Sequence, residues 1–368
     1  MFLEFPDFGY GPASTMLALV SRIAERHAWQ VVSAGAAAEF VGRQLPGAVC
    51  HELDTFVPSS WPGFCGIAPP GSVVVSCTNP EFAAWAIDRG YRVGIVDTLD
   101  WMWAKRPAGL NVADFHLVQA YFGGQVTPNG DRRETIRPVA DPALWRPVGG
   151  GQQPGTALVS FGGMRLPGRD DLVAGYVRWL LSAALPVLVE HAGVERVRIV
   201  GGRSDLADLV PPAWSRHPAL RVGIGVDRAT YAGLVQRAAH LIVSPGLATI
   251  YECAAAGLTP LLQPGFNMSM VLQARDLAAT GYPHVSTWPW LTEATQAVAA
   301  MAEDDGVCHV AEHVTATIHH ADPGGETVAS ALMHYLERGD DAHGLSVPVP
   351  AALPDGADLL ATHLARLT

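Results

Sequence analysis

Short apolar runs alternate with amphipathic stretches along most of this chain. Runs of this length predict buried strands, and the stretches between several of them have the spacing of helices. Strands that alternate with helices predict a parallel sheet with helices on both faces. Up to Ala140, the expected strands are Met1–Phe5, Gln30–Ser33, Ala48–His51, Ser72–Ser76, Arg92–Val96 and Phe115–Val118, and the expected helices include Ala13–His27, Ala37–Gln44 and Glu81–Arg89.

A second alternating set follows a stretch rich in proline and glycine, Asp141–Gly155, which indicates a linker. A chain of 368 residues is long enough for two domains. We therefore expect an α/β protein with two doubly wound, Rossmann-like domains, residues 1–145 and 156–338, and ligands in an interdomain cleft at the carboxyl ends of the strands. A Pro-rich spacer and a last helix, residues 339–368, should dock on one domain. The second set comprises strands Thr156–Ser160, Arg196–Val200, Arg221–Ile224 and Leu241–Val243, with a helix at Asp171–Ala184.

Composition narrows the classes of function. The net charge is −11 and no basic stripe exists, which argues against nucleic acid as a partner. No apolar run is long enough to cross a bilayer and the first residues lack a basic and then apolar leader, so we expect a cytoplasmic protein without a membrane partner. The five cysteines show no CxxC spacing and should be reduced, mostly buried thiols. The sequence is compatible with a homodimer.

The most informative stretch begins at an apolar run that ends in Ser244-Pro245-Gly246. A helical pattern follows as far as Gly257, and a second apolar run, Leu261-Leu262, comes after it. A strand, a glycine-bearing turn and a helix direct backbone N–H groups and a helix N-terminus at one point, which suits a phosphate. Glu252 lies three residues after Thr249 and could accept hydrogen bonds from a vicinal diol such as a ribose. An ordinary βα turn is the alternative.

The pattern G-x-x-T-x-x-E-x-A-A-A-G-L at Gly246–Leu258 resembles the nucleotide-sugar binding region of inverting glycosyltransferases with the GT-B fold. It is most similar to the group that contains the N-acetylglucosaminyl transferase of peptidoglycan synthesis. The resemblance implies that the turn binds the diphosphate of a UDP-sugar, that the glutamate holds the ribose hydroxyls, and that polar residues two turns later contact the donor hexose. The donor-site residues implied are Gly246, Leu247, Ala248, Thr249, Glu252, Asn267, Ser269 and Gln273.

Two further glycine-bearing loops fit the same family. Gly162 and Gly163 follow a predicted strand, and residues without a Cβ let backbone N–H groups approach a phosphate. Arg165 could supply charge to the diphosphate or to an acidic sugar, or could be an ordinary solvated residue. The loop at Gly9–Ser14 corresponds to a family loop that faces donor and acceptor, so Tyr10 and Gly11 are candidate acceptor contacts. Several family members carry a histidine here, but none occurs before His27.

Two carboxylates follow the strand predicted at Arg92–Val96. Asp97 or Asp100 is the candidate general base, because a carboxylate beside bulky apolar groups loses hydration and accepts a proton more readily. Trp101 and Trp103 offer stacking surfaces for a planar acceptor. The alternative is a helix-capping aspartate beside core tryptophans. Lys105 and Arg106 fit the surface better, although either could face an acidic group.

Neither a metal nor a cofactor is expected. His309 and His313 have the spacing to share one helix face, and His319 and His320 follow, but no carboxylate or cysteine completes a ligand set. The sequence also has no D-x-D triplet, so helix dipoles and backbone N–H groups would stabilise the leaving UDP.

The whole chain, especially GYGPAST near its start and SPGLATIYE, resembles the cytosylglucuronate and hydroxymethylcytosylglucuronate synthases of nucleoside antibiotic biosynthesis. This resemblance implies transfer of glucuronate from UDP-glucuronate to N1 of cytosine or hydroxymethylcytosine. A small planar acceptor suits the aromatic candidates, and Arg165 or Arg275 could bind the glucuronate carboxylate. A lipid-linked acceptor is disfavoured because no strongly apolar surface loop is evident in the first domain. The alternatives are a GT-B transferase for another natural-product acceptor, or a UDP-sugar 2-epimerase or hydrolase.

Overall fold

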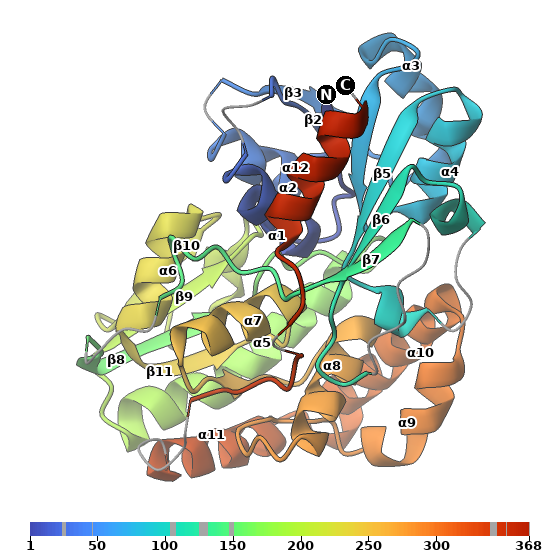
Figure 1. Ribbon diagram of the computed structural model, residues 1–368. Coiled ribbons are helices and arrows are strands. Elements are labelled where there is room, and N and C mark those ends of the chain that lie inside the picture. Colours follow the sequence, from blue (N-terminus) through green and yellow to red (C-terminus); the bar gives the residue numbers. More distant parts are fainter. Residues whose placement is uncertain are drawn as a thin grey trace. The chain divides into compact units, whose positions relative to one another are not determined.

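The computed structural model describes residues 1–23, 27–45, 47–103, 108–124, 132–146, 151–338, 344–350 and 352–367. The chain forms two units, and each is built on one parallel sheet (Figure 1). The first comprises Met1–Asp141 with Pro348–Thr368, and the second comprises Pro142–Val347. The prediction of two doubly wound α/β sheets is confirmed. Lys105, Arg106 and the GG of the expected linker at 149–150 lie outside the described residues.

The first unit contains a seven-stranded sheet in the order β3-β2-β1-β4-β5-β6-β7. Its inner strands are buried on both faces, which explains why they read as continuous apolar runs. Strand β7 was not predicted, because it is an edge strand whose first two residues are charged and only partly buried. The strands are β1 Phe2–Glu4, β2 Gln30–Ser33, β3 Val49–Glu52, β4 Val73–Cys77, β5 Arg92–Asp97, β6 Phe115–Gln119 and β7 Arg133–Ile136.

Two apolar clusters hold the helices of this unit to the sheet. One lies between the sheet and α1, α2 and α12, and the other packs against α3, α4 and a short 3-10 turn. The helix expected to reach His27 ends at Val20, and the Ser21 hydroxyl there bonds to the Ala18 carbonyl, which competes with helical bonding. The helices are α1 Gly11–Val20, α2 Gly35–Gly42, η2 Pro58–Gly63, α3 Phe64–Ile67, α4 Pro80–Asp88, η3 Asp100–Met102, η4 Ala108–Asn111 and α12 Gly356–Leu367.

The C-terminal helix α12 packs on the first unit and lies beside α1 (Figure 1). Leu360 and Leu364 are fully buried there, and the ring of His363 stacks on Phe115 with 4.7 Å between centroids. Asp355, just before the helix, is bonded by Arg22 and Arg137. Burial alone would raise the pKa of Asp355, but these two guanidinium groups lower it to about 2. The last residues therefore belong to the first unit, whereas the sequence set 339–368 apart.

The second unit contains a five-stranded sheet in the order β10-β9-β8-β11-β12. Strand β8 is central, and its register with β11 places Ser160 opposite Val243 at the carboxyl ends of both strands. The strand ends found in the sequence are correct to within three residues. The strands are β8 Gln153–Ser160, β9 Arg196–Gly201, β10 Leu220–Ile224, β11 Ala238–Val243 and β12 Leu261–Leu262.

Helix α5 is the central helix of the second unit. Together with the π-turn that continues it, Asp170–His191 is long and apolar enough to cross a membrane by length and composition, which the sequence analysis missed. Within the unit, 72% of its most apolar window is buried, as in a core helix. The helices are α5 Asp170–Pro186, η5 Val187–His191, η6 Leu206–Leu209, α6 Arg228–Arg237, α7 Leu247–Ala256, α8 Met268–Ala279, α9 Leu291–Ala300, α10 Glu303–Ala316, η7 Thr317–Ala321 and α11 Glu326–Arg338.

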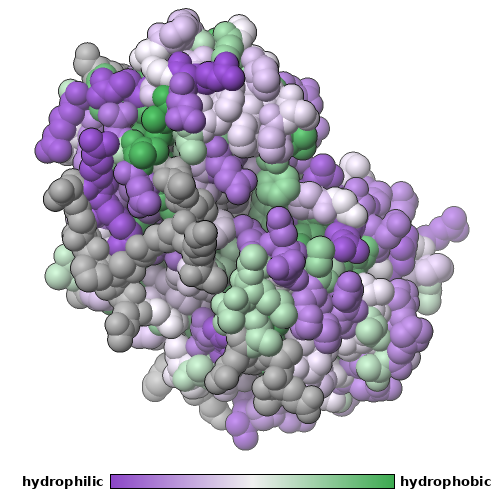
Figure 2. Space-filling model, turned by 90° about the vertical axis from the view of Figure 1, so that its right-hand side faces the viewer, coloured by the Kyte–Doolittle hydropathy of each residue, from purple (hydrophilic) through white to green (hydrophobic). Residues whose placement is uncertain are grey.

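The exposure of side chains differs from two expectations, which concerned apolar surface loops and the burial of the cysteines. Hydrophilic residues predominate on the face in Figure 2, and hydrophobic ones form small separate patches. One loop of the first unit is nevertheless apolar, because Phe56 and Val57 are 48% and 42% exposed and Phe56 stacks on Phe8. The cysteines are also less buried than expected. Cys77 and Cys253 are buried, but edge strand β3, short helix α3 and the outer face of α10 expose Cys50, Cys65 and Cys308.

Candidate functional site

The order of strands reverses at one point in each sheet. Ligands of doubly wound sheets bind outside the carboxyl ends of the strands at such a point. In the second unit it lies between β8 and β11. The predicted motifs Gly162-Gly163 and Ser244–Gly246 follow these two strands, and the Ser244 amide donates to the Ser160 carbonyl at 2.9 Å. Two loops that are about 80 residues apart in sequence therefore meet at one sheet edge.

Helix α7 presents its amino end at this edge. It begins directly after Gly246, and no side chain caps it. The first N–H groups of a helix have no intrahelical acceptor, so Leu247 and Ala248 direct donors and the positive end of the helix dipole at the edge. Gly162 has φ +65°, and an added Cβ at Gly162 or Gly246 would meet no described atom within 4 Å. Gly257 ends the helix in the left-handed region (φ +68°), as predicted.

The carboxylate of Glu252 lies close to a tyrosine that the sequence analysis missed. Glu252 is only 7% exposed. Burial raises the pKa of the Tyr231 hydroxyl, and the negative charge of Glu252 raises it further, while the Ser160 and Thr249 hydroxyls bond to Tyr231 and oppose the shift. The Tyr231 oxygen is 3.2 Å from Ser160 Oγ. Nothing in the local pattern marks Tyr231, because tertiary packing of α6 brings it to this edge.

Of the remaining donor candidates, Asn267 and Ser269 have a structural role that the sequence did not reveal. Asn267 caps α8 by accepting the Met270 amide at 2.9 Å, and it also accepts the Ser269 hydroxyl at 3.0 Å. Gln273 is 2% exposed and its Oε1 has no hydrogen-bond partner among the described residues. Contact of these three side chains with a donor hexose stays a prediction.

The two candidate arginines differ in their surroundings. The Arg165 side chain is 42% exposed and its Nη1 lies 3.7 Å from Asp170. Arg275 Nη2 is 2.5 Å from the carboxylate of its neighbour Asp276. The Arg165 side chain is thus more exposed than that of Arg275, which is 26% exposed.

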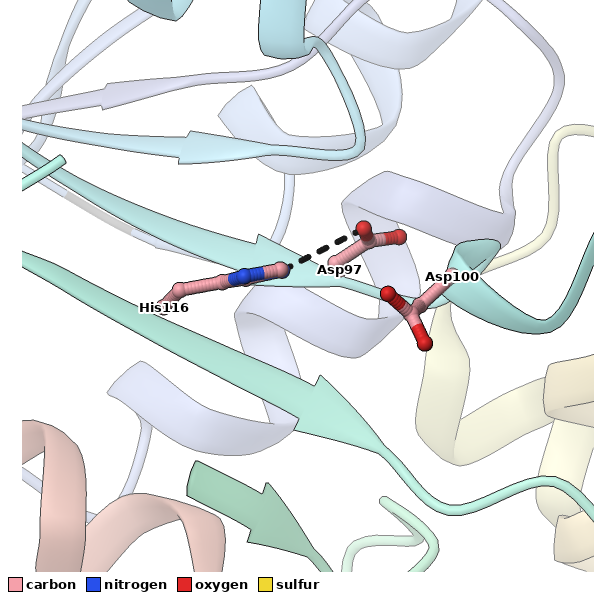
Figure 3. A group of neighbouring side chains, drawn as sticks. All are labelled: Asp97, Asp100 and His116. Carbon is pink, nitrogen blue, oxygen red and sulfur yellow. Dashed lines mark hydrogen bonds and ion pairs between the residues drawn. The ribbon is translucent and has the colours of Figure 1, made fainter. Parts of the chain in front are cut away.

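In the first unit, Asp97 ends β5 and is 1% exposed. Its Oδ1 accepts the Leu99 amide at 2.8 Å, and its Oδ2 accepts the indole N–H of Trp103 at 3.3 Å. His116 of β6 points at the same oxygen, with Nε2 3.3 Å away (Figure 3). The sequence analysis missed His116, although a lone histidine inside the apolar strand FHLVQ was a signal. The geometry makes Asp97 and His116 a buried acid–base pair.

Asp100 lies beside this pair but has a different partner. Oxygen and nitrogen atoms of Asp97, Asp100 and His116 all lie within 4.8 Å of one another, a separation that would suit a metal ion (Figure 3). However, Arg133 Nη2 is 2.6 Å from Asp100 Oδ2, so a fixed cation already neutralises that carboxylate. The arrangement therefore fits an ion-pair network better than a metal site. His309 and His313 do share one face of α10, with ring centroids 4.1 Å apart.

The aromatic acceptor candidates are held by neighbouring groups. Trp101 stacks on Tyr121 with 3.9 Å between centroids and donates its indole N–H to the Thr98 carbonyl. Trp103 packs against the core on the side of α4. Tyr10 stacks on Phe40, and Gly11, which follows it, is exposed. Their predicted contact with an acceptor remains a prediction.

A second buried acid, Glu4, lies at the carboxyl end of β1, next to the point where the order of strands reverses between β1 and β4. Its oxygens accept Thr55 and Ser76 hydroxyls at 2.5 Å each and the Asn79 amide at 2.9 Å. Burial raises the pKa of Glu4 to about 7 despite these three donors. Burial likewise raises the pKa of the Cys77 thiol to about 12, with smaller contributions from the charges of Glu4 and Asp97.

No protein-family model matches the chain, and no curated protein does. Solved structures match along almost the whole length. The spinosyn rhamnosyltransferase SpnG complexed with thymidine diphosphate has a TM-score of 0.54 at 13% identity and covers 98% of this chain and 99% of its own. The same transferase with spinosyn aglycone has a TM-score of 0.51 at 14% identity, with 98% and 99% covered. The chain therefore has the GT-B fold, as predicted.

Proposed function

We propose that this protein is an inverting glycosyltransferase that moves a glucuronosyl group from UDP-glucuronate to N1 of cytosine or hydroxymethylcytosine. The observation that carries the proposal is the uncapped amino end of α7 beside the buried carboxylate of Glu252, at the point where the second sheet reverses its strand order. A helix N-terminus suits a diphosphate, and a carboxylate beside it suits a ribose diol. A structural relative of the same fold is described in complex with a nucleoside diphosphate, which supports this assignment.

The second unit would bind the donor. Backbone N–H groups at Gly246–Thr249 and in the loop at Gly162-Gly163 would take up the charge that develops on the leaving diphosphate. Glu252 would accept hydrogen bonds from the ribose hydroxyls. We assign the glucuronate carboxylate to Arg165, because its side chain is more exposed than that of Arg275. No metal takes part in these steps of the proposal.

The first unit would bind the acceptor and supply the base. The lone pair that N1 holds after losing its proton attacks the anomeric carbon, and the bond from that carbon to the diphosphate oxygen breaks. The N1 proton moves to the Asp97–His116 pair, and UDP leaves with the bonding electrons. Asp97 is the better base candidate of the two, because Asp100 is held by Arg133 at 2.6 Å. Attack from the opposite face inverts the anomeric centre.

Replacing Glu252 by alanine tests the donor site. Glu252→Ala should weaken UDP binding by about 1–3 kcal/mol, the usual loss for a charge-assisted hydrogen bond. Titration calorimetry with UDP measures this directly. Glu312→Ala removes an exposed carboxylate on α10 of the same unit and should leave the dissociation constant unchanged. Equal UDP affinity in wild type and Glu252→Ala would overturn the placement of the ribose.

Mass spectrometry of products tests the reaction itself. Incubation with UDP-glucuronate and cytosine should give cytosylglucuronate and UDP. A larger apolar acceptor is the second candidate, because Phe56 and Val57 are exposed on the same unit and Phe56 stacks on the half-buried Phe8. Transfer to an apolar aglycone but not to cytosine would favour that candidate. Turnover of the UDP-sugar without any acceptor would instead indicate an epimerase or a hydrolase.

A further inference from the structure

Thr78 has an unusual backbone conformation. It joins β4 to α4 with φ +58°, and Met164 is the only other non-glycine residue with positive φ in the described part of the chain. A β-branched residue rarely occupies this region, and such strain is concentrated at functional sites. In α/β-hydrolases a sharp, strained turn between a strand and a helix exposes the nucleophile at the top of the sheet, and Thr78 also occupies a strained turn between a strand and a helix. Within the stretch Val73–Pro80, Thr78 alone is not buried.

The hydroxyl of Thr78 is held by its neighbour Thr98. The two Oγ1 atoms are 3.1 Å apart, and the Thr98 amide donates to Thr78 Oγ1 at 3.4 Å. A hydroxyl has two acceptor lone pairs and one proton. When Thr98 donates both its amide and its hydroxyl proton, the lone pairs of Thr78 are used and its own proton is directed elsewhere. The Cys77 sulfur at 3.5 Å is a weak competing acceptor.

The location of this hydroxyl matters as much as its bonding. Strand β4 is one of the two strands between which the order of the first sheet reverses, where ligands of doubly wound sheets bind. Thr98 directly follows Asp97, the proposed base, so the hydroxyl pair and the base belong to the same edge. The Asp97 carboxylate accepts a proton and the Thr78 hydroxyl donates one. Together they are complementary to a ligand that carries an N–H group next to a C=O group.

We propose that Thr78 is an acceptor-binding residue whose hydroxyl donates to the carbonyl oxygen O2 of cytosine, next to the N1 proton that Asp97 removes. This inference rests on the proposed function. Loss of the N1 proton spreads negative charge onto O2, and a hydrogen bond to O2 stabilises that charge as N1 attacks. The strained turn holds the donor in place before the acceptor binds.

Three variants test the role of Thr78. Thr78→Ala and Thr78→Ser differ by one oxygen atom, and neither is branched at Cβ. Thr78→Ala should lower kcat/KM for cytosine about 10- to 100-fold, while Thr78→Ser should stay close to wild type and UDP binding should not change in either. Thr78→Gly removes the strain and should raise Tm by about 2–4 °C while losing activity as the alanine variant does.

An altered acceptor makes the test specific. In 2-thiocytosine, sulfur replaces O2 and accepts hydrogen bonds weakly, so wild type should prefer cytosine and Thr78→Ala should lose most of that preference. If the alanine variant transfers to cytosine as wild type does, or keeps the full preference, the assignment of Thr78 is wrong and the proposed function stands. If wild type does not transfer to cytosine at all, the proposed function fails, and this inference fails with it.

Discussion

Asp97→Asn is expected to lower kcat by about 10²- to 10⁴-fold, the range for loss of a positioned general base, while leaving UDP affinity unchanged. Asp97 accepts three hydrogen bonds, from Leu99, Trp103 and His116. An asparagine amide would turn one of these acceptor positions into a donor that faces another donor, and it could not take the acceptor proton. Turnover with UDP-glucuronate and cytosine, and UDP titration of the same preparation, measure the two quantities.

Asp100→Asn is the matched control. The amide keeps an oxygen that can accept from Arg133, so the change removes only the charge from that contact and should cost about 1–2 kcal/mol of stability. Its kcat should stay within about tenfold of wild type, far above that of the Asp97 variant. If Asp100→Asn abolishes turnover and Asp97→Asn does not, the base has been assigned to the wrong carboxylate.

The outline of both sheets could be predicted from the sequence because buried parallel strands read as apolar runs. Strand β7 could not, since an edge strand needs no such run, and its residues RETI carry two charges. Gly257 was placed correctly because a helix end in the left-handed region selects glycine by a purely local preference.

Only some residues of each candidate site could be identified from the sequence, for a related reason. Asp97 and Asp100 stand next to a strand end, so local order was enough to place them at the sheet edge. Their partners His116 and Arg133 come from two later strands, and the pairing depends on which strands are neighbours. Tyr231 reaches Ser160 and Thr249 in the same way, through packing of α6. The polar residues that complete each site are therefore set by tertiary contacts, which spacing along the chain does not encode.

Glu4→Gln is expected to make the first unit more stable than wild type above pH 7 by about 3 kcal/mol, with little difference below pH 4.5. The pKa of Glu4 is about 7 in the folded state, against 4.5 as its ordinary value, because burial disfavours the charged form. The folded state therefore binds more protons than the unfolded chain between these pH values. Wild-type stability should fall as pH rises through this window, because ionised Glu4 is costly to bury.

Glutamine suits the site because it has no charge to bury at any pH. Its oxygen can keep accepting from Thr55 and Asn79, and the Ser76 hydroxyl can rotate to accept one of its amide protons. Urea unfolding of both proteins at pH 5 and pH 8 measures the effect, with Glu39→Gln on the exposed face of α2 as the control. The Glu39→Gln control should have the same free energy of unfolding as wild type at both pH values. If the free energies of unfolding of wild type and Glu4→Gln change with pH in parallel, the prediction is wrong. Glu4 would then titrate in the folded protein as it does in the unfolded chain, because its buried hydrogen bonds already stabilise the charged form.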